Sequence, residues 1–238
     1  MKYLTIDTTT KVTALALGYK GQLVAEGFLH TTKTHSERLV PVLDQVLEAA
    51  AWKLQDLDFI GVVRGPGSFT GIRIGIATAQ GLAQVLGLPL VGVLSLDALA
   101  WAGYGREEII VPVLDARKNE WYTAQYQWSR DKQRPIRTKE PMAIEPEQWL
   151  KDLAGLNKRI VFAGDGVVKY AEKIKAILED KAVLLPDYLA LPRGGYAVPC
   201  VWQAWEEGSQ SETVEPYYIR LSEAEVNWAK KEEALKGK

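Results

Sequence analysis

The sequence is poor in the side chains that build metal and cofactor sites. Its 238 residues include one cysteine, Cys200, and two histidines, His30 and His35. A single thiol excludes a disulfide framework and a cysteine-based zinc site. Leu39 stands where a helical histidine pair would place its second ligand after His35. We therefore expect no metal and no cofactor.

An excess of charge of either sign is missing as well. The chain carries 29 Lys and Arg against 30 Asp and Glu, a formal net charge of -1. The field of the whole molecule therefore does not attract nucleic acid or an anionic membrane, and only a local basic patch could do so.

Long hydrophobic runs are also absent. The longest apolar stretch, residues 82–100, is interrupted by two glycines, a proline and Asp97, whereas a membrane helix needs about 20 apolar residues. The first 21 residues alternate as a strand does and lack the apolar block of a secretory signal. We expect a cytoplasmic protein with no membrane partner.

One pattern occurs twice: an apolar strand that ends in Asp, a polar turn and a second strand. Its two copies end at Asp7 and Asp115, 108 residues apart. The pattern is typical of the two-lobed actin-like ATPase fold (ASKHA, ribonuclease H-like), an α/β fold with duplicated mixed-sheet lobes. We place the lobes at residues 1–104 and 105–220, followed by a charged tail at 221–238. We expect a late helix to return and pack on the first lobe.

In that fold the turn after each strand approaches phosphates and the Asp orients a hydrated magnesium ion. The nucleotide-binding candidates are therefore Asp7, Thr8, Thr9 and Asp115. A phosphate loop needs glycines so that bare backbone N–H groups can come close, but residues 8–10 and 116–120 contain none. We favour degenerate turns; the alternative is an ATP-dependent kinase or hydrolase that uses Asp7 and Asp115.

A glycine-rich string, Gly-Pro-Gly-Ser-Phe-Thr-Gly, occupies residues 65–71 between a predicted strand and a helix expected from about Ile72. Its spacing matches neither a P-loop nor a dinucleotide fingerprint. It is either a tight strand-to-helix turn or an anion site at the helix N-terminus. The residues of the second interpretation are Gly65, Gly67, Ser68, Thr70 and Arg73.

The helix after that string carries a stripe of small residues spaced by four, beginning at Gly71. The stripe lets another helix approach closely. Periodicity alone favours two helices, 36–51 and 72–86, that bury each other against the sheet; the alternative is a platform for a partner. The platform residues would be Leu39, Leu43, Gly71, Ile72, Gly75 and Ala79. No catalytic constellation can be assembled from the sequence.

Four segments together resemble the bacterial TsaB (YeaZ) family. They read Ile-Asp-Thr-Thr at residues 6–9, His-Ser-Glu-Arg-Leu at 35–39, Gly-Pro-Gly-Ser-Phe-Thr-Gly-Ile-Arg at 65–73 and Leu-Asp-Ala-Arg at 114–117. The glycine-rich string is the most specific of them. The resemblance is near full length and strongest before residue 126, with later matches at 164–166 and 216–220.

This resemblance implies a noncatalytic member of the actin-like superfamily. Proteins of this family act as partner and scaffold of TsaD, which transfers a threonylcarbamoyl group to the adenosine next to the anticodon of tRNAs that read ANN codons. TsaE, an ATPase, completes the complex, so tRNA is reached through the complex. TsaD carries a metal-binding histidine pair on the helix where this chain has only His35.

The resemblance also implies where the partner docks. The first-lobe helices would pack against the equivalent helices of TsaD, or against a second copy of this chain when TsaD is absent. On that basis the platform residues become the expected docking surface. A large charged residue at Ala79 is then expected to block docking without unfolding the chain.

Overall fold

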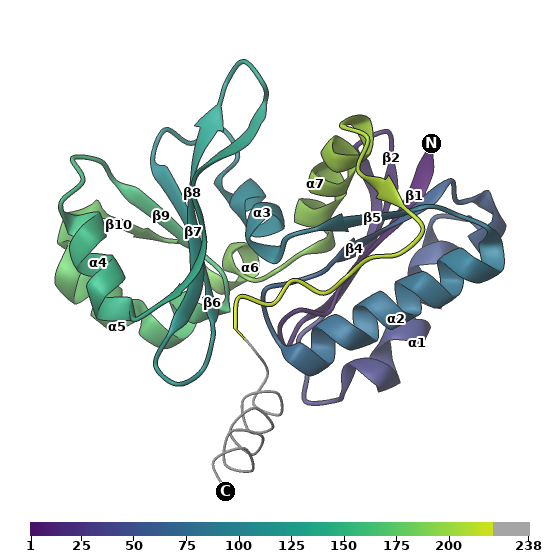
Figure 1. The fold of residues 1–238 in the computed structure, drawn as a ribbon, viewed down its shortest axis with the longest axis horizontal. Helices are drawn as coiled ribbons and strands as arrows, with labels where there is room; N and C mark the ends of the chain where they lie inside the picture. Colours follow the sequence, from purple (N-terminus) through teal and green to yellow (C-terminus); the bar gives the residue numbers. More distant parts are fainter. Residues whose placement is uncertain (221–238) are drawn as a thin grey trace, which may run out of the picture.

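The computed structural model describes residues 1–220, which form two mixed sheets side by side (Figure 1). The predicted tail at 221–238 lies outside the described residues. The first sheet has the order β11-β5-β4-β1-β2-β3 and the second the order β10-β9-β6-β7-β8. The first contains β1 (Lys2–Asp7), β2 (Thr13–Tyr19), β3 (Gln22–Leu29), β4 (Phe59–Val63), β5 (Leu90–Val93) and β11 (Gln210–Ser211). The second contains β6 (Ile109–Asp115), β7 (Trp121–Ser129), β8 (Arg134–Ile144), β9 (Ile160–Ala163) and β10 (Ala182–Leu184).

Both sheets repeat one arrangement, as the duplicated Asp pattern predicts. β1 pairs antiparallel with β2 and parallel with β4, which pairs parallel with β5. In the same way β6 pairs antiparallel with β7 and parallel with β9, which pairs parallel with β10. Asp7 and Asp115 therefore end equivalent central strands and stand before equivalent turns.

Helices cover the first sheet on both faces (Figure 1). Helices α1 (His35–Ala49) and α2 (Phe69–Leu86) pack on one face, where Ile6, Leu15 and Ile60 are fully buried. Strand residues of opposite parity meet α7 (Gly194–Glu206) on the other face. The remaining helices are α3 (Ser95–Ala100), α4 (Pro146–Ala154), α5 (Asp165–Leu178) and α6 (Asp187–Ala190). Helix α3 contacts both α7 and β6 and so joins the two lobes.

The end of the described chain belongs to the first lobe. After β10 the chain returns: β11 pairs antiparallel with β5, and Trp205 of α7 stacks on Phe59 at 4.1 Å between ring centroids. Val214 is buried in the core beneath α1 and α2. A second lobe that runs to residue 220 therefore differs from the structure, although the return of one late helix was expected. No helix among residues 1–220 has the length and apolar character to cross a bilayer.

Candidate functional site

The turn after β1 is enclosed by its own lobe. Asp7 is 4% exposed, and its Oδ1 accepts hydrogen bonds from the backbone N–H of Thr9 at 2.9 Å and from the Thr9 hydroxyl at 2.7 Å. The Thr8 hydroxyl donates to the carbonyl of Gly71 at 2.7 Å. Burial raises the pKa of the Asp7 carboxyl. A carboxylate held in this way presents no open face to a hydrated ion.

The turn after β6 is more open but bulky. Asp115 accepts the backbone N–H of Arg117 at 3.1 Å and the ammonium group of Lys169 at 2.8 Å. Three successive non-glycine residues, Arg117, Lys118 and Asn119, have φ between 51° and 61°. Glycine is the residue that adopts this conformation without strain and leaves the backbone bare. Side chains therefore stand where a phosphate would need to approach.

Asp165, at the start of α5, is a titratable group that the sequence analysis did not select. Its Oδ1 accepts the backbone N–H of Asp115 at 3.1 Å. Burial raises the pKa of Asp165 from 3.8 to about 6, and the charge of Asp115 adds to the effect. The only sequence signal was its place between Gly164 and Gly166 after a predicted strand.

Replacing Asp165 with asparagine is expected to change how stability depends on pH. The folded-state pKa lies above the unfolded value, so the stability that this carboxyl contributes is complete below pH about 4 and is lost as the pH rises through about 6. Asn keeps the acceptor for Asp115 and cannot ionise. Between pH 4 and pH 7 the free energy of unfolding of the unmodified chain should fall relative to Asp165→Asn by at most about 3 kcal/mol.

Urea unfolding at four pH values measures that difference. Asp152→Asn, at an exposed position of α4, is the control and should follow the unmodified chain throughout. Parallel curves for Asp165→Asn and the unmodified chain would contradict the assignment.

His35 is a structural side chain here. Its Nε2 lies 2.8 Å from the carbonyl of Thr10, and its Nδ1 lies 2.7 Å from the hydroxyl of Thr13. Burial lowers the pKa of His35, which favours a neutral ring that donates from Nε2 and accepts at Nδ1. Within residues 1–220, no three His, Cys, Asp or Glu side chains are grouped as metal ligands.

Arg38, which lies in the family string at residues 35–39, has a structural role. It is 4% exposed. Its guanidinium donates to the carbonyls of Lys11, Leu29 and Thr31 and to the Thr31 hydroxyl, over 3.1–3.4 Å. Arg38 therefore ties the turn after the Asp7 strand to the segment that leads into α1.

The glycine-rich string ends earlier than expected, because α2 begins at Phe69 and includes Thr70 and Gly71. Ser68 caps this helix: its Oγ accepts the N–H of Gly71 at 3.3 Å. These contacts fit the interpretation as a strand-to-helix turn.

The other residues of the string are also engaged within the chain. The N–H of Ser68 donates to the carbonyl of Thr9 at 2.6 Å. At Gly67, whose φ is 159°, a Cβ would lie 2.2 Å from the same oxygen. Gly65 has a φ of 113° and lies against the carbonyl of Tyr217. An anion role for Gly65, Gly67, Ser68, Thr70 and Arg73 stays a prediction.

Arg73 contacts the end of the described chain. Its Nε donates to the hydroxyl of Tyr218 at 3.2 Å, and its guanidinium lies 3.9 Å from the centre of the Phe69 ring. Phe69 in turn stacks on Tyr218 at 4.8 Å. These three side chains fasten the returning segment to the start of α2.

The structure corrects the expected docking residues. All six are buried within the first lobe: Leu39, Leu43, Gly71, Ile72, Gly75 and Ala79. The small stripe serves the approach of α2 to β1, since a Cβ at Gly75 would lie 2.4 Å from the Thr8 hydroxyl oxygen. Spacing identifies a face of a helix but not the neighbour that it meets. Ala79 is 0% exposed, so a charged residue there would unfold the lobe rather than only block docking.

The solvent side of the helix pair carries a different set. We call it the outer face, defined by Val40 and Asp44 of α1 and Ala77, Gly81 and Val85 of α2, all exposed. Val40 is 56% exposed and Val85 85%. A Cβ at Gly81 would meet no atom within 4 Å. The two helices lie together on one side of the molecule (Figure 1), and the small residues on α2 leave room for another helix.

Comparisons with known proteins agree with the motifs. A family model described as TsaD, tRNA N6-adenosine threonylcarbamoyltransferase, matches residues 29–228. The tRNA threonylcarbamoyladenosine biosynthesis protein TsaB of Bacillus subtilis is 30% identical, with 96% of this chain and 98% of the relative covered. TsaB of Escherichia coli is 33% identical, with 97% and 98% covered.

Solved structures give the same result for the fold. YeaZ from Pseudomonas aeruginosa superposes with a TM-score of 0.75 at 28% identity, covering 91% of this chain and 99% of that chain. Component A of the Acidaminococcus fermentans (R)-2-hydroxyglutaryl-CoA dehydratase reaches a TM-score of 0.52 at 13% identity, covering 87% and 98%, and shares the fold alone. The expected two-lobed actin-like ATPase fold is confirmed.

Proposed function

Because the chain belongs to the TsaB family of tRNA threonylcarbamoyladenosine biosynthesis proteins, we propose that it is a noncatalytic partner and scaffold of TsaD. In this role it is required for threonylcarbamoyladenosine modification of the adenosine next to the anticodon in tRNAs that read ANN codons. TsaE completes the complex, and tRNA is met through the complex, which places the chain in the cytoplasm.

The enclosure of Asp7 is the observation that supports a noncatalytic role most. Its carboxyl is buried and accepts a hydrogen bond from Thr9, and the equivalent Asp115 forms an ion pair with Lys169. Mg²⁺ is usually held by one or two carboxylates together with the phosphates of a substrate, and the burial of Asp7 takes one of the two candidate carboxylates out of reach. The competing function, an ATP-dependent kinase or hydrolase, predicts calorimetric binding of Mg-ATP and turnover that is lost in Asp7→Asn. Such a result would overturn the scaffold proposal.

Two observations support docking through the outer face: its residues are exposed, and this chain is related to TsaD. The match to a TsaD family model spans α1 and α2, so TsaD is expected to carry equivalent helices. Two related chains can pair through equivalent faces about an approximate two-fold axis. The same face would pair two copies of this chain when TsaD is absent.

A matched pair of variants tests this docking. Ala77→Glu places a charge on the outer face, and Ala176→Glu places the same charge at an exposed position of α5 in the other lobe. We expect Ala77→Glu to weaken TsaD binding by at least about ten-fold, because an unpaired charge is buried on association. Both variants should unfold at the temperature of the unmodified chain.

Reconstitution of tRNA modification is the functional readout. TsaD and TsaE with this chain should produce modified tRNA, and this chain alone should produce none. Ala77→Glu should reduce the yield and Ala176→Glu should not. Equal yields from both variants would show that the outer face is not where the partner docks.

A further inference from the structure

The end of the described chain, residues 212–220, crosses from the first lobe to the second. We call this segment the interlobe strap; in Figure 1 it is the yellow-green stretch that follows β11, passes the start of α2 and ends beside β6. Within residues 1–220 the chain crosses between the lobes at two other places, residues 94–108 with α3 and residues 185–193 with α6. Those two crossings link the lobes covalently. The strap is attached to the second lobe by noncovalent contacts, so this attachment can open and close.

The first lobe holds the strap along most of its length. Val214 is 6% exposed and belongs to the core of that lobe. The backbone N–H of Tyr217 donates to the carbonyl of Arg64 at 2.8 Å. Tyr218 stacks on Phe69 at the start of α2, with 4.8 Å between the ring centroids. The strap up to Tyr218 therefore moves with the first lobe.

Arg220 attaches the strap to the second lobe. Its Nη2 donates to the carbonyl of Ala116 at 2.8 Å, and its Nη1 forms an ion pair with Glu120. Both partners lie in the turn after Asp115, and we call these two contacts of Arg220 the latch. The side chains of Arg220 and Glu120 are 33% and 34% exposed, so salt screens this pair less than a fully exposed one. A guanidinium that binds a carbonyl and a carboxylate together fixes the end of the strap on this turn.

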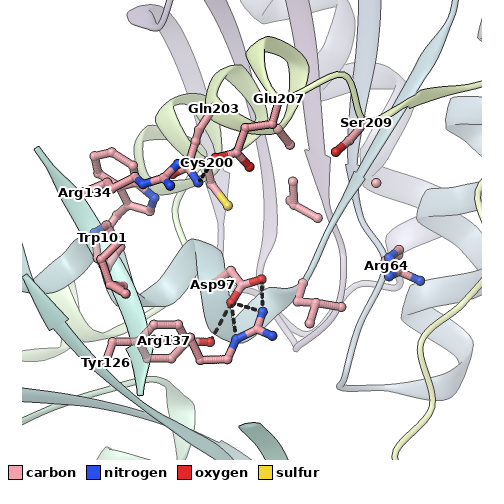
Figure 2. A pocket seen from close by; sticks show the side chains of 16 residues that line it. Arg64, Asp97, Trp101, Tyr126, Arg134, Arg137, Cys200, Gln203, Glu207 and Ser209 are labelled. Atoms are coloured by element: carbon pink, nitrogen blue, oxygen red, sulfur yellow. Dashed lines mark hydrogen bonds and ion pairs between the residues drawn. The ribbon is translucent and has the colours of Figure 1, made fainter. Parts of the chain in front are cut away.

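A polar cluster restrains the lobes at a different place (Figure 2). Asp97 of α3 accepts two hydrogen bonds from Nη2 of Arg137 in β8, at 2.5 and 2.6 Å, and one from the hydroxyl of Tyr126 in β7 at 2.7 Å. Arg137 also donates to Glu140 of its own strand at 2.9 Å. Helix α3 contacts α7 of the first lobe as well. The cluster therefore fixes the covalent link that contains α3 to the second sheet.

Two lobes of one chain move relative to each other unless contacts between them prevent it. We propose that the strap is a conformational device that controls this motion. While Arg220 contacts the turn after β6, the lobes keep one relative position; when the latch opens, the second lobe rotates about the covalent links. Tyr218 and Arg220 are two residues apart, at most about 7 Å of chain. Displacement of Tyr218 from α2 therefore opens the latch too, so the start of α2 controls the position of the second lobe.

Pulsed electron double resonance on the full chain tests the device by measuring the distance between spin labels on the two lobes. The labels are placed at Gln55→Cys, before β4, and Ala176→Cys, on α5; both positions are exposed, and the buried Cys200 stays unlabelled. Labelled chain is diluted with unlabelled chain so that pairs of molecules do not contribute. We expect one narrow distance distribution when the strap is intact. Arg220→Gln should widen it at least about two-fold, because a released lobe samples several orientations.

Two further variants complete the experiment. Tyr218→Ala removes the stacking on Phe69 and leaves Arg220 in place, so it tests the strap at its other attachment and should widen the distribution as Arg220→Gln does. Arg130→Gln is the matched control, because it removes an exposed arginine that pairs with Glu107 within the second lobe. This control should keep the narrow distribution. The thermal transition of each variant shows whether it is folded, and misfolding of one strap variant leaves the other to decide.

Three results would overturn the proposal: a broad or two-peaked distribution with the strap intact, an unchanged distribution in a folded strap variant, or equal widening in Arg130→Gln. The measurement uses this chain alone, without TsaD or tRNA. Failure of the strap would therefore leave the scaffold role untouched, and loss of partner docking would leave the strap intact.

Discussion

Gly71→Ala is expected to destabilise the chain by about 3 kcal/mol, the upper range for overpacking. A Cβ at this position would lie 2.0 Å from the carbonyl oxygen of Thr8. The obstructing atom belongs to the backbone of Thr8, which is fully buried, so it cannot rotate away as a side chain would. To admit one methyl group, α2 would have to move off β1.

Gly81→Ala on the same helix is the matched control, and its expected effect has the opposite sign. No atom lies within 4 Å of a Cβ at Gly81. Ala is favoured over Gly in a helix interior by about 0.5–1 kcal/mol, so this variant should be slightly more stable than the unmodified chain. Urea unfolding of both variants measures the contrast. Equal effects would show that Gly71 is not a point of close approach.

Arg38→Met is the second substitution with a large expected effect, a loss of about 3 kcal/mol in the free energy of unfolding. The change removes the hydrogen bonds of a buried guanidinium to the carbonyls of Lys11, Leu29 and Thr31, to the Thr31 hydroxyl and to Nδ1 of His35. Arg38→Lys should recover little of this loss, because one ammonium group cannot reach acceptors on both sides as a planar guanidinium does.

Arg159→Met, which replaces an exposed arginine, controls for the loss of a positive charge and should change stability by less than about 0.5 kcal/mol. Unfolding by urea, followed by circular dichroism, gives all three values. If Arg38→Met unfolds at the same urea concentration as Arg159→Met, the hydrogen bonds of Arg38 are not important for stability.

Local patterns predicted the strands and their duplication well. Residues 2–7 and 109–115 are short apolar runs that end in Asp, and both are buried along almost their whole length. Such a run, followed by a polar turn and a second strand, is the sequence pattern of a hairpin. The helix over 35–49 was equally readable from its apolar spacing. Each of these signals lies within a few residues of the element that it specifies.

Contacts between segments that are distant in the sequence could not be predicted from such local patterns. The stripe from Gly71 was expected to admit another helix, yet its glycines meet Thr8 of the same lobe. The sequence does not identify the outer face around Gly81. Periodicity shows which residues of a helix share a face, but not which face another element covers. The pKa of Asp165 depends on its nearness to Asp115, fifty residues earlier in the chain. Propensity and spacing carry no information about such neighbours.

Two contacts set the order in which this protein can fold during translation. They are the stacking of Trp205 on Phe59 and the pairing of β11 with β5. When only the first 104 residues have left the ribosome, one face of the first sheet is uncovered. Tyr3, Phe59 and Val91 lie on this face and pack against α7 only after α7 has been synthesised. N-terminal domains usually finish folding first during translation, but here the lobe that begins synthesis is completed last. A premature stop codon before residue 194 would thus release a chain with an uncovered aromatic surface, which is the kind of surface that chaperones bind and proteases clear.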